Sequence, residues 1–465
     1  MGIPFYFASL TKSHKGIIKV VKKETPLNVD AFVIDFNCLI HRYLKDEDPI
    51  TSILDALQYI IDNFCRAKQV IITADGLVPY AKMVQQRYRR MRVEPSGTSA
   101  VDMFPTTAPK NIKVQGSFDR TQISPDTPYM RDLEVAMRSR FPLAIISGTG
   151  NPGEGEHKLI HELKKLPESQ RRTICIYGLD ADLILISLQH HKLSSPNSMW
   201  LLRESAEFND PKLKQAEFAT LSIWSLLDQL PMPIEQYMAI GILCFGNDFM
   251  PNLAMFSLRE DGYDRALHMY TECGKPDLTT PQGRRKFLEL AASREVTHMR
   301  ERIALRKRPE ERALMGKDAS LFSLKYGLHV LDGVTDMRPV VDAYWKTFDW
   351  TLHYFLKGEP KNWDWVYPYS DAPLITDIVK YRESVSTHSK LNFNVTRQLQ
   401  FIMPQKSLRT ARRVVLHPDE IHSETRNPWM KRHDWEMKPR ISLPWNPVYD
   451  LTRVVEQEQI SLQKT

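Results

Sequence analysis

The chain of 465 residues has little cysteine and no long hydrophobic run. Its five cysteines lie far apart with no CxxC pair, which argues against both a disulfide framework and a zinc knuckle. We therefore expect a reducing compartment, the cytoplasm or the nucleus, with a viral origin left open. No stretch reaches the ~18 apolar residues that a membrane span needs. We therefore expect no membrane association, and the start MGIPFYFASL lacks the features of a secretory signal, so secretion is not expected either.

The composition that remains is ordinary for a globular protein, with 42% hydrophobic and 26% charged residues. The formal net charge of +7 is modest, but the charges are unevenly placed. Acids recur at the ends of a few apolar runs, whereas bases cluster elsewhere. Two cysteines, Cys38 and Cys175, lie inside apolar strand-like runs, and we expect both in the core.

Apolar runs alternate with helical patterns through the first 250 residues. This alternation predicts an α/β fold, a parallel sheet flanked by helices on both faces. Residues 93–128 are rich in Pro, Thr, Ser and Gly and predict a surface insertion. The expected strands are AFVIDFN (31–37), QVIITADG (69–76), LAIISGTG (143–150) and TICIYGLD (173–180), and the expected helices are roughly 51–67, 79–92, 153–166 and 181–190.

The second half of the sequence has a different character. Its patterns are helical from about residue 234, and residues 340–368 are dense in tryptophan, at least two of which we expect in the core. Prolines and the basic patch 405–413 mark the C-terminal hundred residues, where extended segments are expected to wrap the core. We expect two regions, an α/β nuclease core over 1–255 and a helical, aromatic-rich region over 256–465 that completes the active-site pocket.

Acidic side chains stand where the predicted parallel strands end. A single aspartate at a strand end is usually a helix cap or a turn residue. Four strands that each end in acid are hard to explain by capping, and closely packed acids without a cation would raise one another's pKa values. Because the carboxyl ends of parallel strands meet at one sheet edge, the acids should converge there. They are Asp35, Asp75, Glu154, Glu156, Asp180 and Asp182.

Carboxylates without histidine or thiolate ligands suit a hard cation such as Mg²⁺. Two such ions, ~3.5–4 Å apart, can activate a water and stabilise the leaving oxygen in phosphodiester hydrolysis. The acids therefore predict a two-metal nuclease site. A seventh acid, Asp248, follows a helical pattern in GNDFMP, where the turn chemistry of a helix C-terminus is an equally good interpretation.

A basic helical pattern follows Asp75 directly. Gln86 stands four residues after Lys82, and Arg89 and Arg90 stand three and four residues after Gln86, so these side chains project from one side of a helix. Guanidinium forks and an ammonium suit a terminal phosphate, although a solvated basic face is the common alternative. We expect phosphate binding by Lys82, Gln86, Arg89 and Arg90.

Histidines offer weaker signals. His41 could stack on a nucleobase, as aromatic rings do in RNA recognition, but a lone histidine is more often structural. His157 and His161 are four residues apart, yet no third ligand accompanies them. We interpret this pair as helix-surface residues.

Seven sequence blocks in order resemble the Xrn family of 5′→3′ exoribonucleases. They are MGIPFYF, VIDFNCLIH, ADGLVPYAKMVQQRYRR, NPGEGEHK, YGLDADLI, GNDFMP and WVYPYSDAP. The resemblance spans most of residues 1–370. It is to a compact version of the catalytic core, without the long C-terminal modules of some members.

The resemblance implies a PIN/flap-nuclease-like fold and hydrolysis of 5′-monophosphorylated, decapped RNA to mononucleotides. All seven acids would bind two Mg²⁺ ions, with Mn²⁺ as an alternative, and Lys82 through Arg90 would form the 5′-phosphate pocket. His41 would stack on a terminal base opposite Trp365, or alternatively Trp363. The partners would be single-stranded RNA and decapping factors, and the chain would act as a monomer.

Two other functions compete with this one. A flap-type DNA endonuclease shares the MGI start and strand-end acids, but the block after Asp75 and the late tryptophan block argue against it. An inert RNA-binding module would not need all seven acids.

Overall fold

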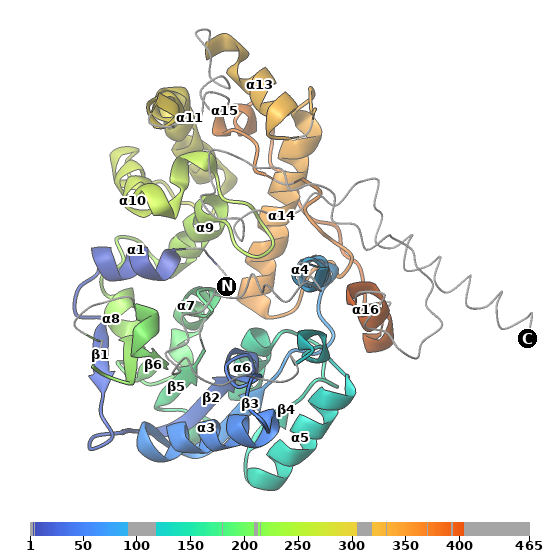
Figure 1. Cartoon of the computed structure of the whole chain (residues 1–465). Helices are drawn as coiled ribbons and strands as arrows, with labels where there is room; N and C mark the ends of the chain where they lie inside the picture. Colours follow the sequence, from blue (N-terminus) through green and yellow to red (C-terminus); the bar gives the residue numbers. More distant parts are fainter. Residues whose placement is uncertain are drawn as a thin grey trace, which may run out of the picture. The chain divides into compact units, whose positions relative to one another are not determined.

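The computed structural model describes residues 3, 5–91, 118–178, 180–208, 213, 215–304, 319–331, 333–369, 371–391 and 394–403, with the backbone alone for 88–91, 207, 208, 319 and 400. Most of the expected insertion at 93–128 and all of the basic patch at 405–413 lie outside these residues. The described chain forms two compact units (Figure 1). We call residues 15–228 with 391–403 the sheet unit, and residues 1–14 with 229–390 the helical unit. The expected boundary at residue 255 falls inside the helical unit. The division into regions 1–255 and 256–465 stays a prediction.

The sheet unit is built on a seven-stranded sheet of order β1-β7-β6-β5-β2-β3-β4. Strands β6, β5, β2, β3 and β4 pair in parallel, whereas β7 pairs antiparallel with both β1 and β6. This confirms the four predicted strands and the α/β class. The strands are β1 Ile18–Val21, β2 Leu27–Asp35, β3 Cys65–Thr73, β4 Ile145–Ser147, β5 Ile174–Tyr177, β6 Met199–Glu204 and β7 Phe218–Ser222.

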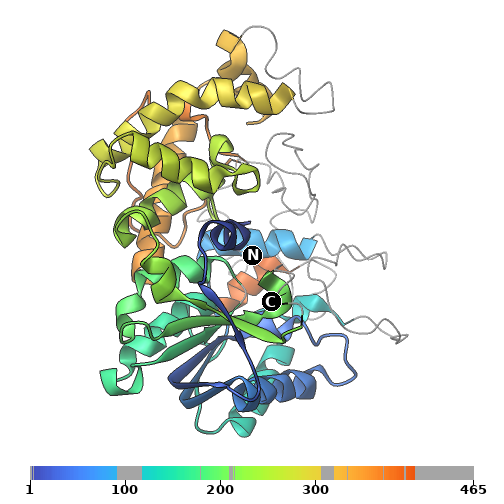
Figure 2. The ribbon, with the colours of Figure 1, turned by 90° about the vertical axis from the view of Figure 1, so that its left-hand side faces the viewer.

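Helices lie on both sides of these strands (Figure 2). Local signals start several of them: Asp48 accepts a hydrogen bond from the Thr51 amide (3.2 Å) ahead of Pro49, and Thr127 caps the next proline-led helix. The helices of the unit are α2 Phe36–Ile40, α3 Pro49–Asn63, α4 Tyr80–Met91, α5 Pro128–Arg140, α6 Gly155–Lys165, α7 Asp182–Gln189, α8 Ile223–Leu227 and α16 Val395–Ile402.

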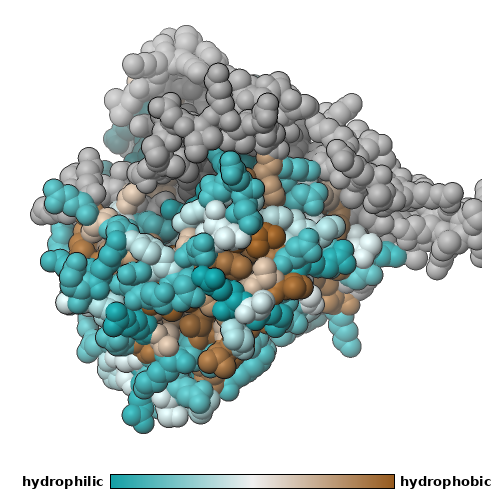
Figure 3. All heavy atoms as spheres, turned by 60° about the horizontal axis from the view of Figure 1, so that its bottom comes forward, coloured by the Kyte–Doolittle hydropathy of each residue, from teal (hydrophilic) through white to brown (hydrophobic). Residues whose placement is uncertain are grey.

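Strand alternation divides the core between the two faces of the sheet. Phe32 and Ile34 of β2 belong to a buried cluster with α2, α3 and α5. Thr73, at the end of β3, points to the other face, where its hydroxyl donates to the Gly155 carbonyl of α6 at 2.9 Å. On the outside of the α3 and α5 layer, hydrophobic residues lie among hydrophilic ones (Figure 3). The hydrogen bond from Thr73 to Gly155 fixes α6 directly over the ends of β2 and β3.

The helical unit has a core of aromatic residues. Tyr237 forms hydrogen bonds with the hydroxyls of Tyr6 (2.7 Å) and Tyr263 (2.9 Å), and Tyr263 continues the chain to His14 Nε2 at 2.9 Å. No helix in the described residues is long and apolar enough to cross a membrane. The helices are α1 Tyr6–Ser13, α9 Ile234–Phe245, α10 Gly262–Glu272, α11 Pro281–Ala304, α13 Phe322–His329, α14 Arg338–Lys357 and α15 Ile375–Ile378.

Two tryptophans of α14 lie in this core. Trp345 and Trp350 are 3% and 0% exposed, which confirms that at least two of the late tryptophans are core residues. The Trp350 indole donates to the Asn362 carbonyl at 2.6 Å and thereby ties the following loop to the helix.

Candidate active site

Two of the predicted acids flank one glycine at the edge of the sheet. Asp35 ends β2, Asp75 lies two residues beyond β3, and Gly155 is the first residue of α6. The Gly155 amide donates to Asp75 Oδ1 at 2.7 Å. A Cβ on Gly155 would stand 2.8 Å from Asp35 Oδ1 and 3.5 Å from Asp75 Oδ1. A side chain at this position would displace Asp35, so glycine lets α6 begin between the two carboxylates at their present spacing.

Asp35 is buried in a way that disfavours its negative charge. Burial, followed by the charges of Asp75 and Asp180, raises the pKa of Asp35 to about 7. The Cys38 thiol donates to its Oδ2 at 3.1 Å and acts in the opposite direction. Its Oδ1 is buried and accepts no hydrogen bond from any described residue. Such an oxygen is suited to a cation.

Glu154 and Glu156 enter the same cluster from the start of α6. Glu154 is 1% exposed, and its Oε2 lies 2.5 Å from the Lys82 ammonium. Burial raises the pKa of Glu156 well above its usual value, and the charges of Asp180, Glu154 and Asp182 act in the same direction. Lys82 opposes this shift. The two glutamates therefore face other acids and share one buried lysine.

Asp180 and Asp182 complete the cluster beyond β5. Asp182 is buried as the first residue of α7, and its amide donates to Asp180 Oδ1 at 3.3 Å. Asp180 also interacts electrostatically with Asp35 and with Glu156. The structure thus brings the six acids of the sheet unit together at the edge where the sequence predicted them.

The chemistry of this set fits a hard divalent cation. All six donors are carboxylates, and the pKa of both Asp35 and Glu156 is raised because like charges are buried together. In the described residues, no three acidic, histidine or cysteine side chains surround a common point as ligands would. Instead, the Lys82 ammonium pairs with the Glu154 carboxylate and the Cys38 thiol donates to the Asp35 carboxylate.

A buried lysine that the sequence patterns did not single out links the loops that carry these acids. Lys158 Nζ donates to the carbonyls of Ala74 (2.7 Å), Gly148 (2.6 Å) and Asn151 (3.1 Å). Burial lowers the pKa of Lys158 to about 8, although the charge of Asp75 opposes this. No sequence pattern reveals such a role, because all three partners are main-chain oxygens.

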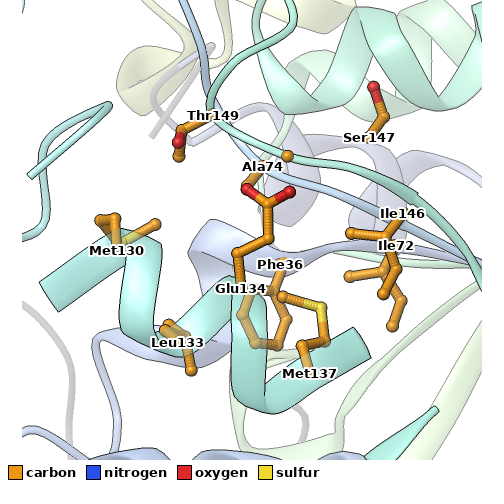
Figure 4. A pocket seen from close by; sticks show the side chains of 11 residues that line it. Phe36, Ile72, Ala74, Met130, Leu133, Glu134, Met137, Ile146, Ser147 and Thr149 are labelled. Carbon is orange, nitrogen blue, oxygen red and sulfur yellow. The ribbon is translucent and has the colours of Figure 1, made fainter. Parts of the chain in front are cut away.

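The loop after β4 is also held from the side of α5 (Figure 4). The Glu134 carboxylate occupies the space next to Gly148, where a Cβ would approach its Oε2 to 2.0 Å. Arg138 fixes that carboxylate, donating to Oε1 at 2.6 Å and to the Ile146 carbonyl at 3.3 Å. The cavity in Figure 4 is lined mainly by apolar core side chains of α5 and the strands, such as Leu133 and Ile72, so it offers few groups for a polar ligand.

Helix α4 carries the residues predicted to bind phosphate. Lys82 and Gln86 are 7% and 5% exposed, so the alternative of a solvated basic face is wrong for these two residues. The side chains of Arg89 and Arg90 lie outside the described part of the structure. The spacing argument for all four residues therefore stays a prediction.

Helix α16, about 320 residues further along the chain, buttresses α4. Its Gln398 accepts a hydrogen bond from the Val78 amide (2.9 Å) and donates to the Gly76 carbonyl (3.2 Å). Phe401 packs its ring on Tyr80, with ring centres 5.5 Å apart. The sequence patterns predicted no role for α16, since a contact this distant along the chain leaves no local signal.

The residues predicted to stack on a base belong to two different units. His41 is exposed just beyond α2, whereas Trp363 and Trp365 are half-buried in the helical unit. The Trp365 indole donates to Thr347 Oγ1 at 3.0 Å, so its ring is anchored at one end. Stacking by His41 and Trp365 or Trp363 stays a prediction.

Asp248 also lies in the helical unit, after α9. The turn that ends this helix is made by its neighbours: Gly246 has φ 67°, and Asn247 Oδ1 accepts hydrogen bonds from the amides of Phe249 (2.8 Å) and Met250 (3.0 Å). These hydrogen bonds do not require the Asp248 carboxylate. Its role as a metal ligand stays a prediction.

Two expectations about burial were wrong. His157 is not a surface residue: it is 4% exposed, and burial, followed by the charges of Lys82 and His190, lowers its pKa to about 3. The helix α6 turns this side toward the cluster, whereas His161 is exposed as expected. Cys175 is a core residue, but Cys38 is only half-buried because its run bends into α2 beyond Asp35.

The fold and the acid cluster together define an α/β protein whose parallel sheet carries, at one edge, carboxylates suited to binding a cation. Two family models match the chain: the XRN 5′-3′ exonuclease N-terminus over residues 1–205 and the Xrn1 helical domain over residues 323–412. The chain belongs to the Xrn family.

Curated relatives agree with this assignment. The chain is 27% identical over 361 residues to 5′-3′ exoribonuclease 2 of Candida glabrata, covering 58% of this chain and 35% of the relative. It is 23% identical over 532 residues to human 5′-3′ exoribonuclease 1, covering 88% of this chain and 31% of the relative. The chain thus spans about a third of the length of these relatives.

Solved structures with some similarity include the catalytic core of Rad2 in complex with DNA, at 13% identity and a TM-score of 0.36, covering 77% of this chain and 96% of that one. A flap endonuclease of bacteriophage T5 matches at 10% identity and a TM-score of 0.32, covering 76% of this chain and 100% of that one. Similarities this low carry no argument about function.

Proposed function

We propose that this chain is a metal-dependent 5′→3′ exoribonuclease that hydrolyses 5′-monophosphorylated RNA to mononucleotides. The observation that carries the proposal is the convergence of six carboxylates from four strands on one sheet edge, with the pKa of both Asp35 and Glu156 raised by burial and neighbouring acids. Membership of the Xrn family supports the substrate and the direction of hydrolysis.

Two Mg²⁺ ions, or Mn²⁺ in their place, would supply an activated water and stabilise the leaving oxygen when bound. The Gly155 amide orients Asp75, and the Asp182 amide orients Asp180, so these side chains are set before an ion arrives. Asp248 would be the seventh ligand. The residues of the sheet unit that would hold the ions are Asp35, Asp75, Glu154, Glu156, Asp180 and Asp182.

Helix α4 would hold the 5′ end of the RNA. The Lys82 ammonium pairs with the buried Glu154, so it would stand between the acids and a terminal phosphate. Gln86 lies one turn further along the helix, and Arg89 and Arg90 would add guanidinium forks. His41 would stack on the terminal base, with Trp365 or Trp363 on the opposite side.

The biological setting follows from this substrate. Decapping reactions generate 5′ monophosphates, so decapping factors are the expected partners of a monomeric enzyme. Free cysteines throughout the described residues are consistent with a reducing compartment, the cytoplasm or the nucleus.

One assay tests the proposal. RNAs of one sequence bearing a 5′ monophosphate, hydroxyl or triphosphate are incubated with the chain in Mg²⁺ or EDTA, and a branched DNA flap serves as a fourth substrate. Mononucleotide release from the monophosphate RNA alone, and only with metal, is expected. Equal degradation of the three RNA ends would refute the phosphate pocket, and internal cleavage of the flap would favour a DNA endonuclease.

Matched variants separate chemistry from binding. Asp180→Ala or Asp182→Ala should abolish turnover while RNA binding survives, because these acids would hold metal rather than RNA. Arg89→Ala should instead weaken the preference for the monophosphate. A fully active Asp182 variant would contradict the metal assignment.

A further inference from the structure

Lys158 differs from the other buried lysine of the cluster in what it binds. Lys82 pairs with the carboxylate of Glu154 at 2.5 Å. Lys158 Nζ donates to three main-chain carbonyls, at 2.6 to 3.1 Å, and it is 5% exposed. An ammonium has three hydrogens, so these carbonyls account for all of its donors.

The three carbonyls belong to the two loops that carry acids. Ala74 immediately precedes Asp75, while Gly148 and Asn151 lie in the loop that leads from β4 to Glu154. Lys158 itself stands on α6, two residues after Glu156. One ammonium therefore joins the segments that present three of the carboxylates.

The same loops also contact each other directly through their main chains. The Gly76 amide donates to the Gly153 carbonyl (2.9 Å), and the Gly153 amide donates to the Leu77 carbonyl (2.7 Å). A Cβ on Gly76 would lie 1.9 Å from the Asn151 carbonyl oxygen. The Lys158 stem also packs on Gly153, since a Cβ there would lie 3.2 Å from its Cγ.

We propose that Lys158 is a positioning residue of the metal site: it holds the loops after β3 and β4 against α6, so that Asp75, Glu154 and Glu156 face one another. Because the ammonium binds carbonyls alone, it draws negative oxygen to itself without occupying any carboxylate. Its positive charge also lies near Asp75 and offsets part of the repulsion within the acid cluster. This inference rests on the proposed function, since it concerns the same metal site.

The test measures Mn²⁺ binding to the full chain without RNA, by the electron paramagnetic resonance signal of the unbound ion. Lys158→Met keeps the packing of the stem and removes the ammonium. Outer-shell partners of metal ligands typically change affinity by ~10–100-fold when lost, so the Mn²⁺ dissociation constant should rise by at least about 10-fold. Mn²⁺ affinity equal to that of the wild type would overturn the inference.

Controls separate positioning from general loss of stability. Leu57→Ala opens a cavity in α3, in the core on the opposite face of the sheet, and should destabilise the chain without changing Mn²⁺ affinity. If it weakened Mn²⁺ binding as much as Lys158→Met did, the effect would be one of stability and the inference would fail.

A second variant covers the case in which Lys158→Met does not fold. Lys158→Gln keeps two amide hydrogens for the carbonyls and loses the charge. Its Mn²⁺ affinity should lie between those of the wild type and of Lys158→Met. If Lys158→Met does not fold, the affinity of Lys158→Gln should still be lower than that of the wild type. Wild-type affinity in the folded Gln variant would also overturn the inference. If instead the wild-type chain binds Mn²⁺ but degrades no RNA, the proposed nuclease function fails while the role of Lys158 stands.

Discussion

Gly155→Ala should separate metal affinity from stability, because one methyl group acts on them in different ways. The new Cβ would stand 2.8 Å from Asp35 Oδ1 and 3.4 Å from the Thr73 carbonyl oxygen. The first distance is too short for any real contact, so the Asp35 carboxylate must move. The hydrogen bond from the residue 155 amide to Asp75 remains, since alanine keeps its N–H.

The size of both effects follows from this geometry. To reach an ordinary contact the Asp35 oxygen must move by about half an ångström, which is the tolerance of a functional constellation. Mn²⁺ affinity should therefore fall by about 10-fold or more, the range seen when metal ligands lose their support. Alanine in place of a glycine in the middle of a helix stabilises by roughly 0.5–1 kcal/mol, and a smaller gain is expected at the first helical position. This gain should offset the strain, so that the free energy of unfolding in EDTA changes by less than about 1 kcal/mol.

The assay compares Mn²⁺ titration with urea unfolding in EDTA for the wild type, Gly155→Ala and Gly150→Ala. Gly150 is the matched control: it lies in the loop after β4, a Cβ added to it would meet no atom within 4 Å, and its backbone is not left-handed. It should bind Mn²⁺ as the wild type does. Unchanged affinity in Gly155→Ala, or equal losses in both variants, would refute the argument that α6 must begin with a bare backbone between Asp35 and Asp75.

Three further predictions concern single side chains. Asp248→Asn should reduce turnover by at least about 100-fold, as expected for loss of a metal ligand. Its free energy of unfolding should stay within about 0.5 kcal/mol of the wild type, because Asn247 makes the turn. A large loss of stability would instead support a structural role for Asp248. Alkylation of Cys38 should weaken Mn²⁺ binding through its contact with Asp35, and Cys38→Ala should resist the reagent; equal sensitivity of that variant would place the effect at another cysteine. Burial raises the pKa of Glu295 to about 7 from 4.5, so the folded chain retains a proton in this range that the unfolded chain releases. Its free energy of unfolding should fall by up to about 3 kcal/mol as pH rises from 4.5 to 7, and a Glu295→Gln variant with the same pH profile would contradict this.

The sequence was sufficient to predict the sheet and the convergence of its acids, because both follow from local patterns. Runs such as AFVIDFN are apolar enough to be buried strands, and parallel strands place their carboxyl ends at one edge. Asp35 and Asp75 therefore lie where the shared direction of the parallel strands puts them.

The supports of the site could not be predicted in the same way. Lys158 looks like any lysine on an amphipathic helix, because its partners are carbonyl oxygens that no residue type encodes. His157 was expected at the surface, since a four-residue spacing does not reveal which side of a helix is covered. Gln398 acts on the loop after β3 from about 320 residues away, and local patterns carry no information over that distance.

Each of the two units is built from separate segments of the chain, which affects the order in which they can fold during synthesis. Helix α1 is synthesised before the sheet unit, yet the partners of its Tyr6 and of the adjoining His14 are Tyr237 and Tyr263, more than 200 residues later. The sheet unit can close around residues 15–228 in the meantime, but α4 lacks its brace until Gln398 is made. A fragment ending at Asp228 would therefore leave the polar groups of α1 without their native buried partners. Neither unit can be released by a single cut, and any attempt to isolate the sheet unit must rejoin α16 to it through an artificial linker.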